Sequence, residues 1–267
     1  MDEPVTVDDA PGATILPPVQ GGVTFRDVTF GYEPGVTVLQ NVSFTVQPGE
    51  SIALVGPTGA GKSTVVNLIC RFYNIDSGQI LLDETHDIAD VTLASLRQQY
   101  GIMMQDSFIF SGTIMDNIRY GRLDATDDEV VVAAKAVCAH DFIKAMDKGY
   151  QTPVNERGSS LSQGQRQLIA FARTLLSDPK ILILDEATSS IDTKTERLLQ
   201  QGIAALLKDR TSFIIAHRLS TIKNCDRILY IADHGIAESG SHEQLMKQQG
   251  LYYHLYTAQS RDQGVTP

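Results

Sequence analysis

The chain has 267 residues, a net charge of −10 and 42% hydrophobic residues, which allows one large domain or two lobes with a substantial core. The acidic balance argues against DNA or RNA as a partner, because binding of their phosphates needs a basic face. The apolar runs are far shorter than the roughly 20 residues of a membrane span, so no span is predicted. The first 25 residues contain no Lys or Arg, which argues against a targeting peptide. The three cysteines lack metal-ligand spacing and are expected to be reduced thiols in a cytosolic setting.

The amino-terminal third is predicted to pass from an extended segment to strands. The first 20 residues hold four of the ten prolines and four acidic residues, which predicts a linker that is not part of the core. From Val23 to Phe30, and again over 42–46, apolar and polar residues alternate as in half-buried antiparallel strands. A continuous apolar run over 52–55 predicts a buried strand, followed by a glycine-rich turn and a helical pattern over 64–70.

Residues from about 106 to 177 are expected to be mainly helical. A capping box over 126–129 opens a helix that is predicted to run to about Met146. The S-x-x-Q pattern over 162–165 opens a second helix, through about Leu176, which Asp-Pro then stops.

Two further apolar runs, over 181–184 and 212–216, predict buried strands. Because strands then alternate with helices, the sequence predicts an α/β fold with parallel βαβ units.

The glycine-rich turn matches G-x-x-x-x-G-K-S between a predicted strand and a predicted helix. Its glycines let successive N–H groups face a triphosphate, and the helix N-terminus adds a favourable partial charge. Lys62 is expected to neutralise β and γ oxygens, and the Ser63 hydroxyl to bind Mg²⁺. The alternative is a glycine-rich turn that only enters a helix, which this context disfavours. The predicted nucleotide-binding residues of this segment are Gly56, Pro57, Thr58, Gly59, Ala60, Gly61, Lys62, Ser63 and Thr64.

Asp185 and Glu186 follow the apolar run over 181–184, at the carboxyl end of a predicted strand, where open α/β sheets bind ligands. Asp185 is expected to reach Mg²⁺ through water, and Glu186 to polarise the attacking water. The alternative is an acidic pair that caps the strand end.

With these motifs, the sequence resembles the nucleotide-binding domain of ABC transporters over roughly residues 20–259. Residues 161–165, Leu-Ser-Gln-Gly-Gln, are similar to the LSGGQ signature, twenty residues ahead of the acidic pair. The resemblance implies a P-loop ABC ATPase fold with a RecA-like mixed sheet core, an N-terminal antiparallel β layer and an inserted helical subdomain. The domain is expected over 21–259, between a linker over 1–20 from an absent transmembrane domain and a tail over 260–267.

The signature departs from the family pattern in one place, since Gln163 stands where the family has its first glycine. A first helical position accepts a side chain, whereas a Cβ at Gly164 would crowd the γ-phosphate. Ser162, Gly164 and Gln165 are therefore expected to bind nucleotide. Ser162 and Gln165 are also expected to cap the helix, whose free N–H groups are themselves an anion site.

Other family elements follow in order. Tyr32 resembles the aromatic residue that stacks on adenine, with a surface-turn tyrosine as the alternative. Gln105 resembles the glutamine that senses Mg²⁺ and the γ-phosphate and contacts the membrane domain. Residues 155–158, Asn-Glu-Arg-Gly, resemble the segment that touches the intracellular loops in exporters. Asp192 resembles the D-loop aspartate and is expected to cap a helix that begins at Thr193.

His217 ends a predicted strand and matches the switch histidine, which implies that it holds the γ-phosphate and aligns Glu186 with water. The remaining histidines are expected to be surface or packing residues: His86, His140, His234, His242 and His254.

The resemblance implies a head-to-tail dimer with a second copy or a homologous ABC domain, in which each Mg-ATP lies between 56–63 of one subunit and 162–165 of the other. The sequence over 216–220, Ala-His-Arg-Leu-Ser, resembles exporters of the multidrug or lipid half-transporter type, because importers usually have Asp after the histidine. The resemblance thus implies an ATPase on the cytoplasmic face of the membrane. It is expected to bind ATP and Mg²⁺ and to be coupled to a transmembrane domain of the same full-length chain.

Competing interpretations differ in what they require. A soluble ABC ATPase of chromosome maintenance or DNA repair needs a long coiled coil between phosphate loop and signature, and the 99 residues between Lys62 and Ser162 contain none. A small-molecule kinase has no use for the signature, and a GTPase needs an N-K-x-D motif that is absent. A catalytically impaired partner in a heterodimeric exporter stays open as an alternative.

Overall fold

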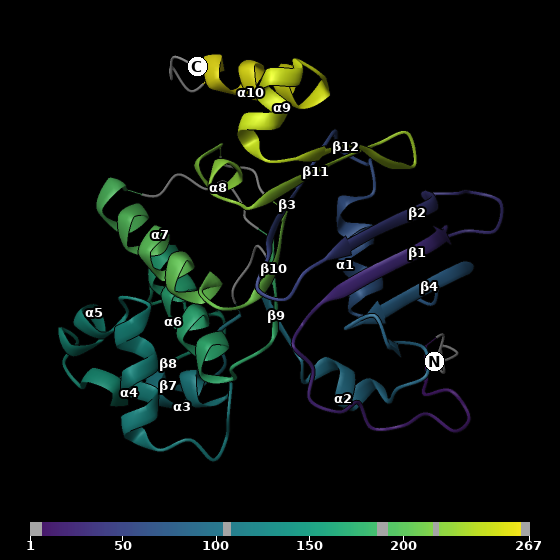
Figure 1. The fold of residues 1–267 in the computed structure, drawn as a ribbon. Helices are drawn as coiled ribbons and strands as arrows, with labels where there is room; N and C mark the ends of the chain where they lie inside the picture. Colours follow the sequence, from purple (N-terminus) through teal and green to yellow (C-terminus); the bar gives the residue numbers. More distant parts are fainter. Residues whose placement is uncertain (1–6, 104–107, 186–191, 216–218, 263–267) are drawn as a thin grey trace.

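The computed structural model describes residues 7–103, 108–185, 192–215 and 219–262. Figure 1 shows an antiparallel β layer beside a larger, mainly parallel sheet, with a group of helices at the opposite side of that sheet. This is the α/β arrangement that the alternation of strand and helix patterns predicts.

The N-terminal β layer is an antiparallel sheet in the order β2-β1-β4-β5. Phe25 and Phe44 are register partners in β1 and β2, and their rings stack with centroids 4.5 Å apart. The alternating pattern of the sequence is therefore confirmed as half-buried antiparallel strands. The strands are β1 (Val23–Phe30), β2 (Leu39–Val46), β4 (Ser77–Leu82) and β5 (His86–Asp87).

The larger sheet has the order β12-β11-β3-β10-β9-β6. Neighbouring strands from β11 to β6 are parallel, and β12 is antiparallel to β11. The predicted parallel βαβ units are thus confirmed. The strands are β3 (Ser51–Val55), β6 (Tyr100–Met103), β9 (Ile181–Asp185), β10 (Thr211–Ile215), β11 (Arg227–Ala232) and β12 (Gly235–Gly240).

The two faces of this sheet contribute to two hydrophobic cores. In β3, Ala53 and Val55 belong to a cluster shared with the helical side of the molecule, whereas Ile52 and Leu54 belong to a cluster shared with the β layer. Side chains alternate between faces along a strand, and both faces are covered here. This is why the parallel strands read as uninterrupted apolar runs rather than as alternating ones.

The helices fall into three groups in chain order. Near the β layer lie α1 (Lys62–Ile69) and α2 (Leu93–Arg97). The helical subdomain contains α3 (Ile114–Arg119), α4 (Asp127–Ala136), α5 (His140–Lys144), the 3₁₀ turns Gly149–Gln151 and Glu156–Gly158, α6 (Gln163–Leu176), and the short strands β7 (Gly112–Thr113) and β8 (Pro153–Val154). The carboxyl-terminal third holds α7 (Thr193–Leu207), α8 (Leu219–Lys223), α9 (His242–Gln248) and α10 (Leu251–Asp262).

One predicted helix is wrong in extent. The helix expected to continue to Met146 ends after α4, and the chain resumes in α5. Cys138 adopts a left-handed conformation with φ 61°; its N–H donates to Lys135 O and the N–H of Ala139 donates to Ala134 O. These two bonds form a Schellman motif, which normally uses glycine at the left-handed position. With cysteine there, the sequence carries no stop signal.

The expectation that residues 1–20 contribute nothing to the core is also wrong for its described part. Leu16 and Val19 are only 5% and 3% exposed, and both belong to the cluster under the β layer. Thr14 forms a parallel bridge with Val91, and the N–H of Leu16 donates to Ser95 Oγ at 3.0 Å. Prolines and acids exclude helix and sheet here, but an extended segment still packs when side chains elsewhere accept its N–H groups.

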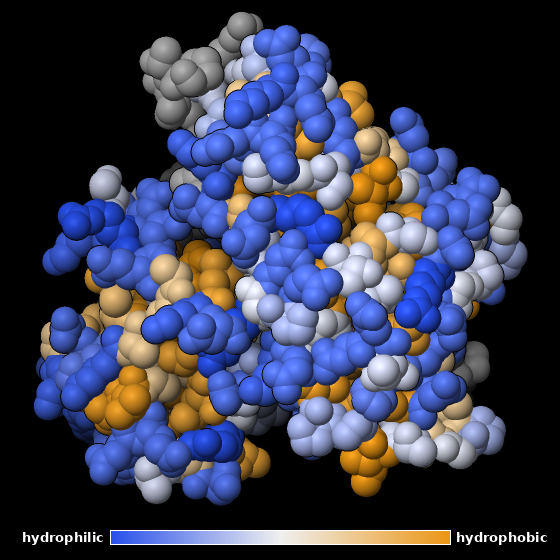
Figure 2. All heavy atoms as spheres, in the orientation of Figure 1, coloured by the Kyte–Doolittle hydropathy of each residue, from blue (hydrophilic) through white to orange (hydrophobic). Residues whose placement is uncertain are grey.

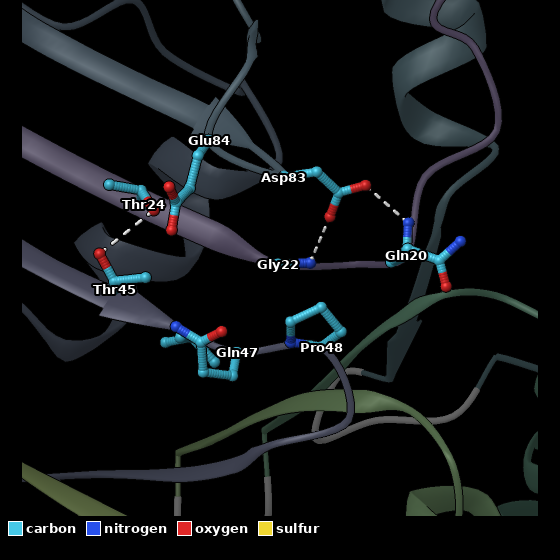
Figure 3. Close-up of a pocket in the computed structure, with 9 residues that line it drawn as sticks. Gln20, Gly22, Thr24, Thr45, Gln47, Pro48, Asp83 and Glu84 are labelled. Atoms are coloured by element: carbon cyan, nitrogen blue, oxygen red, sulfur yellow. Dashed lines mark hydrogen bonds between the residues drawn. The ribbon is translucent and has the colours of Figure 1, made fainter.

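A single carboxylate holds the end of this segment. Asp83 accepts hydrogen bonds from the backbone N–H groups of Gln20, Gly21 and Gly22, at 2.6, 3.1 and 2.7 Å. Figure 3 shows Asp83 reaching across to Gln20 and Gly22 at the mouth of a small pocket. Such charge-assisted bonds are stronger than neutral ones, so the segment enters β1 in a fixed direction.

The surface is mainly polar. Figure 2 shows hydrophilic side chains over most of one face, with hydrophobic ones gathered in places over the helical subdomain. In the part of the chain that the structure describes, every helix falls short of the length and apolar character of a membrane span.

Candidate functional site

The predicted site lies at one edge of the parallel sheet. Because β3, β10 and β9 run in the same direction, their carboxyl ends meet at this edge. The register aligns Leu54, Ile215 and Asp185 across the three strands, and the predicted phosphate loop starts at Gly56, directly after β3. The strand, loop and helix of the motif are thereby confirmed, and Asp185 lies at the predicted strand end.

Three predicted residues follow these strand ends in the sequence. Gln105, Glu186 and His217 come shortly after β6, β9 and β10, respectively, and all three lie outside the described residues. Their roles therefore stay predictions.

Glycines shape the phosphate loop. Gly56 has φ 140°, and a Cβ on it would lie 2.2 Å from the carbonyl oxygen of Ile231. Gly61 has φ 104° and is the N-cap of α1. A side chain at either position would therefore be strained or would clash. Gly59, also at positive φ, faces open space, so the tip of the loop leaves room for a ligand.

The N-terminus of α1 is open to an anion. No side chain caps it, and its first turn contains no acidic residue. Ser63 is exposed within that turn, and Thr64 is buried behind it. Uncapped N–H groups and the positive end of the helix dipole form a phosphate site without further side chains.

Lys62 supplies the cation of this loop. Its Nζ donates to the carbonyl oxygens of Gly56 and Pro57, both at 2.8 Å. Partial burial lowers the pKa of Lys62, and the charge of Asp185 opposes that shift. The lysine head is thus held over the loop and lies within electrostatic reach of the strand-end carboxylate.

Ser63 and Asp185 fit the predicted magnesium site in their chemistry. A hydroxyl and a carboxylate are hard oxygen donors of the kind that Mg²⁺ prefers. Asp185 is half-buried at the end of β9, so its carboxylate is partly open at the sheet edge. The third predicted donor, Gln105, belongs to the undescribed residues.

Tyr32 lies beside the phosphate loop. Its phenol oxygen is 3.1 Å from Thr64 Oγ1 in the first turn of α1, and the side chain is 46% exposed. An exposed ring attached to the helix that follows the phosphate loop is where a base-stacking group is needed. The tyrosine is therefore held by tertiary contacts to α1, unlike a free surface-turn tyrosine.

The predicted signature begins α6, and its capping is confirmed. Ser162 Oγ accepts from the N–H of Gln165, and Gln165 Oε1 accepts from the N–H of Ser162, a complete capping box. Gln163 is the first residue of the helix and is half-buried, so this position accepts its side chain as predicted.

Gly164 has a structural reason to be glycine that the sequence does not reveal. A Cβ built on it would lie 2.1 Å from Thr195 Cγ2 and 3.9 Å from Leu199 Cδ1, both on α7. Because α6 and α7 approach closely here, a side chain at this position would require Thr195 to move. The expected closeness to a γ-phosphate is a separate reason and stays a prediction.

Two flanking motifs are partly described. Asp192 Oδ1 accepts from the N–H of Thr195, which confirms Asp192 as the N-cap of α7, and hydrogen bonds from Thr195 lower the pKa of this carboxyl. Residues 155–158 form a turn in which Asn155 and Glu156 are exposed, and it ends at the buried Gly158, whose φ is 58°.

The phosphate loop and the signature belong to different cores. Helix α1 packs through Val65 and Leu68 into the cluster under the β layer, and α6 packs through Leu168 and Ile169 into the cluster of the helical side. The structure therefore brings Lys62, Tyr32 and Asp185 to one region but assigns the signature to the other lobe of the chain.

Sequence reasoning missed one neighbour of the site. Asn67 Nδ2 donates to the phenol oxygen of Tyr32 at 3.1 Å. The only signal available is its spacing, because Asn67 lies three residues after Thr64 and thus shares a face of the helix with it. An asparagine inside a helix carries no further information by itself.

The chain matches known proteins over the same segments. A profile described as ABC transporter matches residues 39–189, which include the phosphate loop, the signature and Asp185. The chain is 52% identical over 259 residues to the uncharacterized ABC transporter ATP-binding protein YfiC of Bacillus subtilis (strain 168), covering 97% of this chain and 43% of that protein. It is 50% identical over 243 residues to the fatty acid ABC transporter ATP-binding/permease protein of Mycobacterium tuberculosis (strain CDC 1551 / Oshkosh), covering 91% and 38%.

A solved structure agrees with these relatives. A bacterial Atm1-family ABC exporter with ATP bound superposes with a TM-score of 0.88 at 45% identity, over 96% of this chain and 45% of that chain. The chain thus spans less than half the length of these relatives. From the matched profile, the identity and the observed order of phosphate loop, signature and strand-end carboxylate, we conclude that the chain belongs to the ABC transporter family and has its P-loop ABC ATPase fold.

Proposed function

We propose that this chain is the ATP-hydrolysing motor domain of an ABC exporter. The observation that carries the proposal is the phosphate loop: an uncapped helix N-terminus, a lysine held over the loop and an aspartate at the end of β9, on the same edge of the sheet. A triphosphate with its metal ion needs this set of groups. The solved relative is an exporter with ATP bound, and one curated relative is a fatty acid transporter, which favours the exporter class.

Each residue of the site is proposed to bind a different part of the nucleotide. The N–H groups of the first turn of α1 donate hydrogen bonds to the phosphate oxygens, and Lys62 leaves its two carbonyl partners to bind β and γ oxygens. Ser63, Asp185 and Gln105 are the side chains that would hold Mg²⁺, which when bound neutralises charge on the phosphates. Tyr32 receives the adenine.

Hydrolysis rests on two residues outside the described ranges. Glu186 is proposed as the general base that polarises the attacking water, and His217 as the group that keeps the γ-phosphate and this water aligned. Both follow strands whose carboxyl ends lie at the edge where Asp185 is found.

The site is proposed to be shared between two subunits. The phosphate loop and the signature pack into different cores, and Ser63 and Ser162 are both exposed, so the proposal has each segment face a partner in a head-to-tail dimer. ATP would join Lys62 of one subunit to Ser162 and Gly164 of the other. Loss of the γ-phosphate then separates the halves, which converts hydrolysis into motion.

A membrane domain is the proposed recipient of this motion. Phe108 and Phe110, shortly after Gln105 in the sequence, form an exposed aromatic cluster with Tyr120 at the end of α3. The Arg173 guanidinium lies 5.2 Å from the ring centre of Phe110 and donates to Phe108 O, so the cluster is held in place. Exposed aromatic patches are typical of protein contacts. The proposal locates the chain at the cytoplasmic face of a membrane.

The first experiment changes the proposed base. Glu186→Gln should keep ATP binding but lower turnover by about 100-fold or more, the scale of losing a general base. The variant should elute as an ATP-bound dimer in size-exclusion chromatography. Glu243→Gln, on the exposed side of α9, is the matched control and should hydrolyse ATP normally. Hydrolysis by Glu186→Gln at the parent rate would show that Glu186 is not the base.

The second experiment tests the shared site and the competing alternative. Specific ATPase activity should rise with protein concentration, because a dimer forms by mass action. Constant activity across a dilution series would indicate a self-sufficient monomer. ATP binding without turnover at any concentration would instead identify the chain as the impaired partner of a heterodimeric exporter.

A further inference from the structure

The loop that carries Tyr32 leaves β1 and returns to β2, and its backbone is closed locally. The N–H of Val38 donates to Phe30 O at 2.8 Å, and the N–H of Val36 donates to Glu33 O at 3.0 Å. Neither bond involves the Tyr32 side chain. The direction of the ring must therefore be set by side-chain contacts.

Two hydrogen bonds attach the phenol to α1. Tyr32 OH lies 3.1 Å from Thr64 Oγ1 and accepts a hydrogen bond from Asn67 Nδ2, also at 3.1 Å. With Asn67 as donor, the phenol proton remains free for Thr64. Thr64 and Asn67 are three residues apart and so lie on one side of the helix.

Two aromatic rings complete the arrangement. Phe30 and Tyr73 each lie with their ring centre 4.9 Å from that of Tyr32, at interplanar angles of 84° and 86°. These are edge-to-face contacts, which hold a ring without covering both of its faces. This agrees with a tyrosine that is restrained and still 46% exposed.

We propose that Asn67 is a positioning residue for the adenine-binding ring, and that it adjusts the affinity for the nucleotide base through Tyr32. This inference rests on the proposed role of Tyr32 in stacking on adenine. A ring that is already oriented loses less freedom when the base binds, so affinity improves without a new contact. Because α1 also begins with the phosphate loop, one rigid helix sets the base platform and the phosphate site in register.

The test separates base from phosphate binding by using two probes, ATP and inorganic triphosphate, each titrated by calorimetry. Asn67→Ala should weaken ATP binding about threefold, the scale of one neutral hydrogen bond. It should leave triphosphate binding unchanged, because that probe has no base. Tyr32→Phe, which keeps the ring and removes the hydroxyl, should show the same pattern.

The double variant gives the sharpest result. In the Tyr32→Phe background, Asn67→Ala should cause no further loss of ATP affinity, since its acceptor is already gone; independent effects would multiply to about ninefold. Gln79→Ala removes an amide-to-carboxylate bond with Asp87 in the β layer, and it should leave both affinities unchanged.

Three outcomes would overturn the inference. Equal weakening of ATP and triphosphate by Asn67→Ala would show that Asn67 acts on the phosphate loop. Unchanged ATP affinity in Asn67→Ala, with about tenfold weakening in Tyr32→Ala, would reject the positioning role alone. Unchanged ATP affinity in Tyr32→Ala would reject the stacking role on which the inference rests.

Discussion

The two helix N-termini that are proposed to bind one nucleotide differ in how they are closed. Helix α1 begins at Lys62 with no side-chain cap and no acidic residue in its first turn. Helix α6 begins at Gln163 behind a complete capping box between Ser162 and Gln165. Capping boxes also close α3, α4 and α9. Helices α2 and α5 lack a side-chain cap as well, but the first N–H of α2 donates to the Asp9 carboxylate and α5 has Asp141 in its first turn, so α1 differs from both in having no carboxylate at its start.

The difference suggests an order of binding. The N–H groups at the start of α1 have no side-chain cap, so a phosphate meets an open site there. At α6 the N–H groups of Ser162 and Gln165 already have partners within the box, so a phosphate must be accommodated around them. We therefore expect ATP to bind first to the phosphate loop and the signature to close on it second.

The largest expected effect tests the uncapped N-terminus of α1. Lys62→Ala should weaken ATP binding by about 100-fold, because it removes a cation whose charge-assisted hydrogen bonds contribute about 1.5–3 kcal/mol each. Calorimetric titration measures the change. Lys247→Ala on α9 is the matched control for a lost surface charge and should bind ATP normally. A similar ATP affinity in Lys62→Ala and Lys247→Ala would remove the phosphate loop from the proposal.

Features of the site that are local in sequence were the ones that could be predicted. The phosphate loop and the capping boxes that start α4 and α6 each occupy a few consecutive residues, and the structure confirms them. The fold class follows similarly, because buried parallel strands appear as continuous apolar runs.

What could not be predicted depends on residues far apart in the chain. Nothing near Gly164 indicates that Thr195 fills the space beside it, and nothing near Gly22 indicates that Asp83 binds its N–H group. The end of α4 was missed for another reason: Cys138 takes the left-handed position that usually requires glycine, so the local signal was absent.

The glycine near the start of α6 is expected to be required by packing against α7. Gly164→Ala should lower the free energy of unfolding by about 1–3 kcal/mol, because the new Cβ overlaps Thr195 Cγ2. Thr195→Ser removes that methyl group. In the Thr195→Ser background, Gly164→Ala should therefore become neutral or stabilising, as expected for Gly→Ala within a helix.

The same pair of variants distinguishes packing from phosphate contact. If Gly164 also has to approach a γ-phosphate, the double variant should recover its stability in urea titrations but not its ATPase activity. Recovery of both would show that the packing against α7 is the whole reason for the glycine. Continued instability of the double variant would contradict the packing explanation.

The capping box of α6 allows a smaller and matched comparison. Ser162→Ala should cost about 1 kcal/mol of stability, the typical effect of a lost N-cap. For a chain of this size that lowers the melting temperature by about 2–4 °C. Thr126→Ala removes the equivalent cap on α4 and should cost a similar amount. ATPase activity should fall in Ser162→Ala only, and an equal fall in both variants would reduce Ser162 to a structural cap.

The smallest expected effect is the pH dependence of ATP affinity, and it arises at the N-terminus of α1 alone. Burial lowers the pKa of Lys62 below its ordinary value of 10.5, and Asp185 limits the shift. The charged ammonium binds phosphate, and it loses its proton as the pH rises through the lowered pKa. Affinity for metal-free ATP should therefore fall a few-fold, at a lower pH than an ordinary lysine would require. Asp185→Asn should move this fall to lower pH, because it removes the charge that raises the pKa. Lys62→Arg stays charged and should give a flat profile from about pH 8 to 10. Ser162 and Gln165, at the start of α6, do not titrate in this range. If the ATP affinity of Lys62→Arg fell as much as that of the parent, the pH dependence would arise elsewhere than at α1.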